Sequence, residues 1–350
     1  MELRENQPLA ELTTFGIGGP ARWFADANTE ADVEEAVRFA RQHALPLFVL
    51  GGGSNLLVAD EGFSGLVLRM QIPGIRRRND ADGTAVFQMG AGIEWDAAVE
   101  GFLLAKCAGA ESLAGIPGTV GGTPVQNVGA YGCEVGELID CVRVFDTEEL
   151  KWVELSAAEC NFAYRHSRFN TVDRGRYIVS RVDYRLRPGG EPLIRYAELE
   201  RQLAAEGGER SLLQVANVVR RLRRSKGMLM VDDDVNCHSA GSFFKNPFVS
   251  EAELEAISKV AEKPAPRFAA PDAPGKMKVP AAWLIEQAGF AKGYGTGRAG
   301  VSDRHTLALV NRGQATAADV LALAAEIRAG VAQRFGIRLE MEPVRLGFAD

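Results

Sequence analysis

The sequence predicts an α+β protein with more than one domain. Its 350 residues exceed the roughly 250–300 at which a single hydrophobic core stops growing. Segments with helical spacing of apolar residues alternate irregularly with short strand-like runs, which is typical of the mixed class. The 38 glycines exceed the usual share of about 7% and cluster, which indicates backbone loops close to a ligand.

The first part of the chain is predicted to hold one helix and several strands. Residues 29–44 form the helix, with Thr29 as its N-cap and apolar residues at helical spacing. A short apolar strand, LPLFVL, then leads into the glycine segment GGGSN at 51–55. The residues that follow, LLVADEGFSGLVLRM, have the pattern of strand, turn and strand, whereas a Rossmann turn continues into a helix. This context excludes a Rossmann dinucleotide site.

The middle of the chain is predicted to be a mixed α+β domain around a glycine-lined groove. Residues 84–92 are expected to form a strand and 94–107 an amphipathic helix. The densest glycine region follows at 109–134, and further strands are expected at CVRVFDT, KWVEL and RYIVSRVDYRLRP. A stretch with proline and glycine near 188–192 indicates a domain boundary.

Helices dominate the pattern of the last part of the chain. Residues 211–227 are predicted to form a helix with a basic C-terminal end. Its inward-facing residues are Leu212, Val215, Val219 and Leu222. A loop is expected at 263–278 and two further helices at 279–289 and 316–336. The last helix has Thr316 and Asp319 as its start signal and Gly336 as its stop signal.

Composition excludes several classes of protein. The formal net charge of −6 argues against a general nucleic-acid binder, so any bound anion needs a local basic pocket. The five cysteines form no CxxC and indicate a reduced, cytosolic environment, and no two histidines are spaced as a metal pair. The segment MELRENQPLAEL has no apolar signal core, and no run approaches the roughly 18 residues of a membrane span. A soluble, cytoplasmic protein without a metal site is expected.

Two glycine-rich segments are the candidate cofactor site. Successive glycines such as those of GGGSN let the backbone approach a phosphate and point N–H groups at it, although this segment alone fits a plain turn equally well. In AGIPGTVGGTPVQNVGAYG, small and apolar residues are interleaved as if packed against a flat ligand. Because neither segment continues into a Rossmann or P-loop helix, the pair suits an extended dinucleotide such as FAD.

Charged and polar candidates lie in four further segments, and each also has a purely structural interpretation. In NFAYRHSRF, Arg165 is either stacked on aromatic rings or available as a planar fork for a carboxylate. The segment LEMEPVR fits an exposed edge strand protected by charge, and Ser242 in SAGSFFKNP is either a strand end in a core or a reacting hydroxyl. The basic cluster is a solvated helix face or part of a diphosphate pocket; it comprises Arg220, Arg221, Arg223, Arg224 and Lys226, with Lys276, Lys278 and Lys292 in the same half.

Several segments together resemble one family over almost the whole chain. They are TTFGIGGPA, LGGGSNLLVAD, AGIPGTVGGTPVQNVGAYG, FAYRHSRF, AGSFFKNP, AAWLIEQAG and LEMEPVR, and they occur in the expected order. The resemblance is to the UDP-N-acetylenolpyruvoylglucosamine reductase (MurB) family of peptidoglycan precursor synthesis. It implies a two-lobed, non-Rossmann FAD-binding domain of the PCMH/vanillyl-alcohol-oxidase type plus an α+β substrate-binding domain. The implied bounds are 1–70 for the first FAD-binding lobe, completed by 337–350, then 71–205 for the second lobe and 206–336 for the substrate-binding domain.

The resemblance also implies a reaction, the NADPH-dependent reduction of UDP-N-acetylglucosamine enolpyruvate to UDP-N-acetylmuramate. Hydride from reduced, non-covalently bound FAD would go to the enolpyruvyl methylene carbon. Ser242 would supply the proton, while Arg165 and Glu342 would stabilise the carboxylate intermediate; the match to LEMEP favours Glu342 over Glu340. FAD contacts are expected at Gly51, Gly52, Gly53, Ser54, Asn55, Ile116, Pro117, Gly118, Gly121, Gly122, Asn127, Gly129, Ala130, Tyr131 and Arg345. Substrate contacts are expected at Tyr196, Arg223, Lys226, Asn246, Lys278 and Lys292.

Two other functions compete with this interpretation. One is an oxidase or dehydrogenase of the same FAD-domain type, some of which attach flavin through His or Cys; neither glycine motif contains such a residue, although Cys133 lies just beyond the second. The other is a nucleotide-sugar binding protein without catalysis. The implied partner is a small nucleotide sugar, with neither nucleic acid nor membrane, and a monomer is expected.

Overall fold

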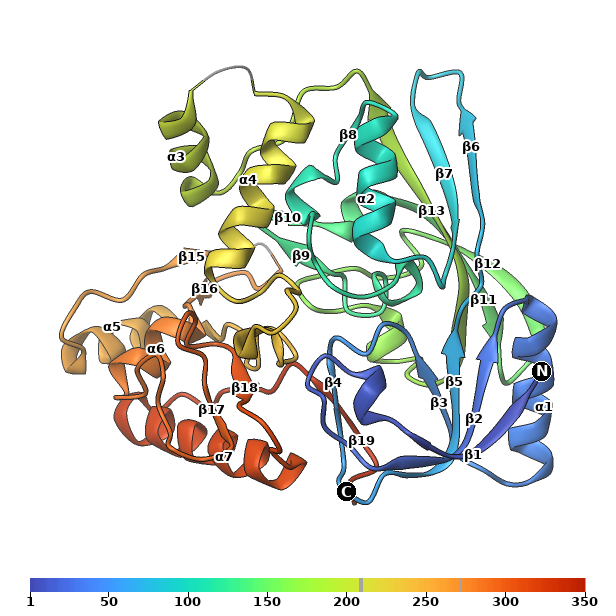
Figure 1. The fold of residues 1–350 in the computed structure, drawn as a ribbon. Helices are drawn as coiled ribbons and strands as arrows, with labels where there is room; N and C mark the ends of the chain where they lie inside the picture. Colours follow the sequence, from blue (N-terminus) through green and yellow to red (C-terminus); the bar gives the residue numbers. More distant parts are fainter. Residues whose placement is uncertain (208–209, 271, 350) are drawn as a thin grey trace. The chain divides into compact units, whose positions relative to one another are not determined.

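The computed structural model describes residues 1–207, 210–270 and 272–349, and the chain divides into two compact units (Figure 1). Unit 1 comprises Met1–Gln7, Ala21–Gly52 and Ser64–Arg224, and unit 2 comprises Pro8–Pro20, Gly53–Phe63 and Ser225–Asp350. Unit 1 therefore continues through the stretch at 188–192 where the sequence indicated a boundary. The division of the chain into two FAD-binding lobes and a substrate-binding domain stays a prediction.

The first part of unit 1 is a four-stranded sheet with one helix. The sheet has the order β1-β2-β5-β3. Its strands are β1 (Leu3–Pro8), β2 (Pro20–Ala27), β5 (Phe63–Met70) and β3 (Leu47–Leu50). Helix α1 (Glu30–Gln42) begins with a reciprocal capping box between Thr29 and Asp32, and its apolar face is buried in a core with Leu66 and Leu68. The helix predicted over 29–44 and the strand after it are confirmed.

The second part of unit 1 is an antiparallel sheet of order β12-β11-β13-β7-β6, green to cyan in Figure 1. Its strands are β12 (Lys151–Ser156), β11 (Ile139–Asp146), β13 (Tyr177–Pro188), β7 (Ala85–Gly90) and β6 (Ile75–Asn79), and the two-residue β8 (Cys107–Ala108) pairs with β13. Helices α2 (Trp95–Leu104), α3 (Ala197–Glu206) and α4 (Leu212–Ser225) contribute to the same core. The rings of Trp95, Phe102 and Tyr184 contact one another at its centre. Helix α2 ends before the predicted 107 because Lys106 takes a left-handed backbone conformation, φ +53°.

Unit 2 joins segments from both ends of the chain. Strand β4 (Leu56–Val58) runs parallel to β19 (Val344–Leu346), and β17 (Ala299–Val301) pairs with β18 (Leu309–Asn311). Its helices are α5 (Glu251–Val260), α6 (Ala281–Gln287) and α7 (Ala317–Phe335). Helix α7 begins with a Thr316–Asp319 capping box and ends at Gly336 with φ +71°, as the sequence predicted.

One prediction in unit 2 was incomplete. The segment expected as a loop, 263–278, contains β15 (Phe268–Ala269) and β16 (Met277–Lys278), which form a small sheet with β14 (Phe248–Val249) in the order β14-β16-β15. Two-residue strands are too short to show an alternating pattern in the sequence. No helix within the described ranges is long and apolar enough to cross a membrane, and no three His, Cys, Asp or Glu side chains there gather as metal ligands would.

Candidate active site

The two glycine-rich segments predicted to bind FAD meet in unit 1. Gly51 and Gly52 follow β3 directly, and Gly118 and Thr119 precede a 3₁₀ turn at Val120–Gly122. A Cβ atom on Gly52 would lie 2.6 Å from the Cα of Gly118, and one on Gly51 would lie 3.0 Å from Thr119 Oγ1. Only glycine permits so close an approach of one backbone to another, which explains the residue type at Gly52.

The seam between these segments is rich in hydrogen-bond donors. In the part of the chain that the structure describes, the peptide N–H groups of Gly52, Gly118 and Thr119 donate to no protein acceptor. The Thr119 hydroxyl is also buried without a partner there. Donors without an acceptor on two closely adjoining segments suit an anionic, oxygen-rich group such as a diphosphate. The residues present therefore fit a dinucleotide cofactor.

Further along the second glycine-rich segment, the Asn127 side chain forms hydrogen bonds with three other residues. Its amide donates to Glu134 Oε2 at 2.6 Å and to the Ala163 carbonyl at 2.9 Å, and its Oδ1 accepts from the Gly136 N–H at 2.9 Å. The next residues form a hairpin in which Gly129–Ala130 pairs with Cys133–Glu134. The side chain of Asn127 thus has a structural role, and its contact with FAD stays a prediction.

Arg165 is held beside this hairpin within unit 1. The residue lies in a tight turn at φ +54°, closed by a bridge between Ala163 and His166. Its Nη2 donates to the Gly129 carbonyl at 3.1 Å, and the guanidinium lies 5.4 Å from the ring centroid of Tyr164. The guanidinium thus stacks on an aromatic ring, as in the structural interpretation drawn from the sequence, and its binding of a carboxylate stays a prediction.

The basic cluster at the end of α4 has two kinds of members. Arg220 pairs with Asp96 at 2.9 Å, and Arg221 pairs with Glu206 on an exposed surface. Arg223 instead turns towards the second glycine segment, where its Nε donates to the Gly115 carbonyl at 2.8 Å. Burial lowers the pKa of Arg223. Of these three arginines, only Arg223 contacts a predicted ligand-binding segment.

Two tyrosines of unit 1 pack against each other. The rings of Tyr131, in the second glycine segment, and Tyr196, at the start of α3, have centroids 5.5 Å apart with planes at 81°. Burial raises the pKa of Tyr131 to about 12. Tyr196 remains 37% exposed, and its contact with the substrate stays a prediction.

In unit 2, the Ser242 segment pairs with the segment that carries Glu342. The Glu342 N–H donates to the Phe243 carbonyl at 2.9 Å, and Phe244 bridges Met341 in antiparallel fashion. On its other side, the Phe243 N–H donates to the Leu307 carbonyl at 2.7 Å. The structure therefore brings two of the three predicted catalytic residues, Ser242 and Glu342, onto neighbouring stretches of backbone.

The other predicted residues of unit 2 have different surroundings. Asn55 donates from Nδ2 to the Glu342 carbonyl at 3.4 Å and accepts the Val344 N–H at 3.0 Å, which ties the end of GGGSN to the terminal motif. Asn246 accepts the Ala281 N–H at 2.9 Å at the start of α6. Arg345 and Lys292 are exposed, Arg345 with its guanidinium 5.8 Å from the Phe348 ring.

Sequence reasoning missed two aromatic residues next to Lys278. In the three-stranded sheet, Lys278 of β16 lies directly opposite Phe248 on one side and Phe268 on the other. Directly opposed residues share a face of a sheet, so the lysine lies in a row between two rings. Phe268 is 48% exposed, which is unusual for a large aromatic residue. The sequence could not show this position, because its strand has only two residues.

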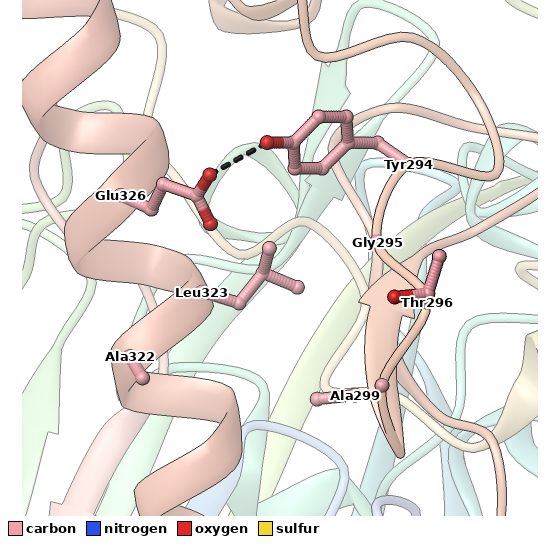
Figure 2. Close-up of a pocket in the computed structure, with 8 residues that line it drawn as sticks. Tyr294, Gly295, Thr296, Ala299, Ala322, Leu323 and Glu326 are labelled. Atoms are coloured by element: carbon pink, nitrogen blue, oxygen red, sulfur yellow. Dashed lines mark hydrogen bonds between the residues drawn. The ribbon is translucent and has the colours of Figure 1, made fainter.

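A pocket of about 480 Å³ in unit 2 contains none of the predicted site residues (Figure 2). It is lined by Tyr294, Gly295, Thr296, Gly297, Ala299, Ala322, Leu323 and Glu326. Figure 2 shows the Tyr294 hydroxyl pointing at Glu326, to which it donates at 2.6 Å, and this bond raises the pKa of Tyr294. Its polar side chains are Tyr294, Thr296 and Glu326, and because none of them belongs to a predicted motif, the candidate chemistry is sought at the motif residues instead.

Comparison with known proteins identifies the family. The FAD binding domain model matches residues 21–149, and the UDP-N-acetylenolpyruvoylglucosamine reductase C-terminal domain model matches residues 233–346. A UDP-N-acetylenolpyruvoylglucosamine reductase of Thermobifida fusca is 47% identical, covering 98% of this chain and 97% of the relative. The chain belongs to the UDP-N-acetylenolpyruvoylglucosamine reductase family. The family member of Streptomyces coelicolor is also 47% identical, over 98% of this chain and 90% of the relative.

A solved structure supports the same assignment to the UDP-N-acetylenolpyruvoylglucosamine reductase family. The crystal structure of the MurB protein of Thermus caldophilus is similar with a TM-score of 0.64 and 28% identity, covering 99% of this chain and 98% of that one. The resemblance drawn from the motifs and the α+β class are confirmed. The chain is an oxidoreductase of this family with FAD as its cofactor.

Proposed function

We propose that the chain catalyses the NADPH-dependent, FAD-mediated reduction of UDP-N-acetylglucosamine enolpyruvate to UDP-N-acetylmuramate, a step of peptidoglycan precursor synthesis. The observation that carries the proposal is the backbone pairing of the Ser242 segment with the Glu342 segment in unit 2. A proton donor and a carboxylic acid on two paired backbone segments suit a reaction that adds hydrogen beside a carboxylate. The names of the relatives, which are reductases of this substrate, point the same way.

The reaction adds a hydride and a proton across the carbon–carbon double bond of an enol ether. FAD, when bound and reduced by NADPH, would supply the hydride to the methylene carbon. The former double-bond electron pair then resides on the neighbouring carbon and is spread onto the attached carboxylate. The protein therefore has two tasks, to stabilise this charge and to protonate that carbon.

Ser242 is the proposed proton donor. It follows a glycine at φ +71° and precedes two phenylalanines that are each 1% exposed, so the surrounding backbone is fixed and water is excluded on that side. Its hydroxyl proton bonds to the carbon, and the resulting alkoxide takes a proton from solvent water before the next turnover, so that each turnover consumes one hydride and one proton. Glu342, on the paired segment, assists at the carboxylate.

Arg165 is proposed to bind the substrate carboxylate. A guanidinium keeps its charge at every physiological pH, and its planar fork matches the two oxygens of a carboxylate. The contacts with Gly129 and Tyr164 restrict the side chain to few rotamers, which lowers the entropy that binding must overcome.

The remaining predicted residues are proposed to bind the nucleotide sugar. The cations Arg223, Lys226, Lys278 and Lys292 complement its diphosphate, and Tyr196 and Asn246 add hydrogen-bonding groups. The row of Phe248, Lys278 and Phe268 offers a face on which a nucleobase can stack. The proposed enzyme is a cytoplasmic monomer that binds neither nucleic acid nor membrane.

An anaerobic experiment in two steps tests the proposal. NADPH is added to the purified holoenzyme first, and the flavin absorbance near its visible maximum should fall. UDP-N-acetylglucosamine enolpyruvate is then added, and the absorbance should recover with formation of UDP-N-acetylmuramate. A flavin that is bleached by NADPH but does not recover with this substrate would contradict the proposed substrate. Reoxidation by oxygen in place of the substrate, at a rate that matches catalytic turnover, would favour an oxidase.

A further inference from the structure

Glu134 is a half-buried carboxylate near Arg165 that is not among the predicted site residues. It lies in the hairpin of the second glycine-rich segment, where its Cα is paired directly with that of Gly129. Directly opposed residues of an antiparallel pair share a face of the hairpin, and Gly129 places no side chain on that face. The Glu134 side chain therefore extends over Gly129, where a Cβ atom on the glycine would lie only 2.9 Å from Glu134 Cγ.

The Arg165 guanidinium reaches the same place from the neighbouring turn. Its Nη2 donates to the Gly129 carbonyl at 3.1 Å, and its Nη1 would lie 3.4 Å from a Cβ atom on Gly129. The side chains of Glu134 and Arg165 thus approach one point beside Gly129, and the missing side chain leaves room for both. Opposite charges at such short range attract each other, and a carboxylate matches the planar fork of a guanidinium.

The Asn127 amide fixes the Glu134 carboxylate relative to the turn that carries Arg165. Its Nδ2 donates to Glu134 Oε2 at 2.6 Å and also to the Ala163 carbonyl at 2.9 Å, and Ala163 closes that turn. The amide is itself held in place, because Asn127 is 1% exposed and its Oδ1 accepts the Gly136 N–H at 2.9 Å. One buried amide nitrogen therefore connects the acidic residue with the turn of the arginine.

We propose that Glu134 is a positioning residue that orients the Arg165 guanidinium for the carboxylate of the enolpyruvyl substrate. This inference rests on the proposed function and adds a residue that acts through Arg165 without touching the substrate. A guanidinium fork binds both oxygens of a carboxylate only when the two groups lie in one plane. The Glu134 carboxylate and the Gly129 carbonyl together restrict the guanidinium to one orientation, so that the fork is set before the substrate arrives.

The charge of Glu134 gives this role a kinetic signature. Glu134 and the substrate carboxylate are both anionic, so removing the charge of Glu134 does not weaken the attraction of Arg165 for the substrate. Loss of orientation, in contrast, is felt most in the transition state, where negative charge develops on the substrate carboxylate. A variant should therefore have a lower kcat without a higher KM, which is the pattern for an interaction needed in the transition state.

Glu134→Gln tests the inference in the holoenzyme, because glutamine keeps the shape of the side chain and an oxygen for Asn127 but removes the charge. The kcat should fall by about 10- to 100-fold, which is what a misplacement of about 1 Å costs, and KM for UDP-N-acetylglucosamine enolpyruvate should not rise. Stopped-flow absorbance should show slower flavin reoxidation by this substrate and unchanged flavin reduction by NADPH. Glu154→Gln is the matched control, because Glu154 pairs with Arg181 at 2.8 Å elsewhere in unit 1, and its kcat should equal that of the parent.

A second measurement shows whether Glu134 acts through Arg165. Arg165→Lys already removes the planar fork, so adding Glu134→Gln to this variant should lower kcat further by less than about threefold. The thermal midpoint and the visible flavin spectrum of Glu134→Gln should match those of the parent. A residue that only stabilises the hairpin would lower the midpoint, and its effect on kcat would be as large with lysine at position 165 as with arginine.

Several results would overturn the inference. A parental kcat in Glu134→Gln would show that the orientation of Arg165 does not depend on this charge. Equal slowing of both half-reactions, or loss of flavin, would assign Glu134 to the cofactor site, and a raised KM with unchanged kcat would make it a substrate contact. If the reduced flavin of the parent is not reoxidised by the enolpyruvyl substrate, the proposed function fails together with this inference, and the parent shows this before any variant is made.

Discussion

Ser242 and Arg165, which are proposed to act on the same enolpyruvyl group, are held in place by different means. Phe243, the residue after Ser242, is bonded through its backbone on both sides, and its ring is buried against those of Phe15 and Phe244. Arg165 instead lies in a tight turn at φ +54°, and its guanidinium donates to the Gly129 carbonyl and lies over the Tyr164 ring. Apolar packing and backbone hydrogen bonds hold the segment of the first residue, whereas contacts of its own side chain hold the second.

The difference shows which properties of each region can be changed separately. The Ser242 side chain takes no part in the backbone bonds and ring contacts of Phe243 that hold this segment. The Ser242 hydroxyl can therefore be removed without loosening the backbone. Around Arg165 the same side chain makes the contacts that restrain it, so any substitution alters both chemistry and geometry. Unit 1 also contains ion pairs, because arginines of β11 and β13 pair with acidic residues of α1, β12 and β11.

The largest effect is expected for Ser242→Ala. The variant should keep flavin reduction by NADPH but lose flavin reoxidation by the enolpyruvyl substrate, by about 10²–10⁴-fold for a missing general acid. Stopped-flow absorbance measures the two half-reactions separately. Because the backbone pairing does not involve the hydroxyl, the thermal midpoint should not change. Reoxidation at the parental rate would remove Ser242 from the mechanism.

Phe243→Ala tests the apolar packing next to Ser242, and not the Ser242 hydroxyl. The ring is 1% exposed, with centroids 6.3 Å from Phe15 and 5.3 Å from Phe244, so its loss should cost about 3–5 kcal/mol of unfolding free energy. Urea unfolding measures this cost. As control, Phe268→Ala removes a ring that is 48% exposed and should change stability by no more than about 0.5 kcal/mol. Equal costs for the two variants would contradict the proposed role of apolar packing around Ser242.

Arg165→Lys tests the polar side of the comparison. Lysine keeps the charge but loses the planar fork, so turnover should fall by about 10²–10³-fold, as for removal of one preorganised donor. FAD should remain bound, which the visible spectrum of the purified variant checks. Arg221→Lys, on the exposed surface beside Glu206, is the matched control and should leave turnover unchanged. Loss of flavin from Arg165→Lys would move this residue to the cofactor site.

The sequence predicted those parts of the fold and site that depend on local signals. Capping residues mark the start of α1 and both ends of α7. The residues after GGGSN correctly excluded a Rossmann turn, because they form a strand and not a helix. Contacts between distant segments leave no such signal, and the pairing of Phe243 with Glu342 could be expected only from the family pattern. The partners of individual side chains could not be predicted from the sequence either. Only the packing of α4 shows that Arg223 turns inward while Arg221 pairs with Glu206.

The smallest expected effect concerns the charged frame of unit 1 and depends on pH. Asp146, 2% exposed at the end of β11, accepts from Arg176 Nη2 at 2.7 Å and from the Glu148 and Glu149 N–H groups. The Arg176 guanidinium, together with these backbone N–H groups, holds the pKa of Asp146 below its ordinary value. A carboxyl group with a depressed pKa in the folded state stabilises the protein above the unfolded pKa, about 3.9, and this contribution disappears as the pH falls through the folded value.

Asp146→Asn should therefore lower the unfolding free energy by about 1.5–3 kcal/mol at pH 7, the range for a hydrogen bond to a charged group. The difference between parent and variant should shrink steadily below about pH 4. Urea unfolding at pH 7, 5 and 3 measures it, with Phe243→Ala as the reference whose cost comes from apolar packing and should not change over this range. If the unfolding free energies of the parent and Asp146→Asn differed as much at pH 3 as at pH 7, packing and not charge would account for the difference. The contrast between polar contacts in unit 1 and apolar packing around Ser242 would then not hold at Asp146.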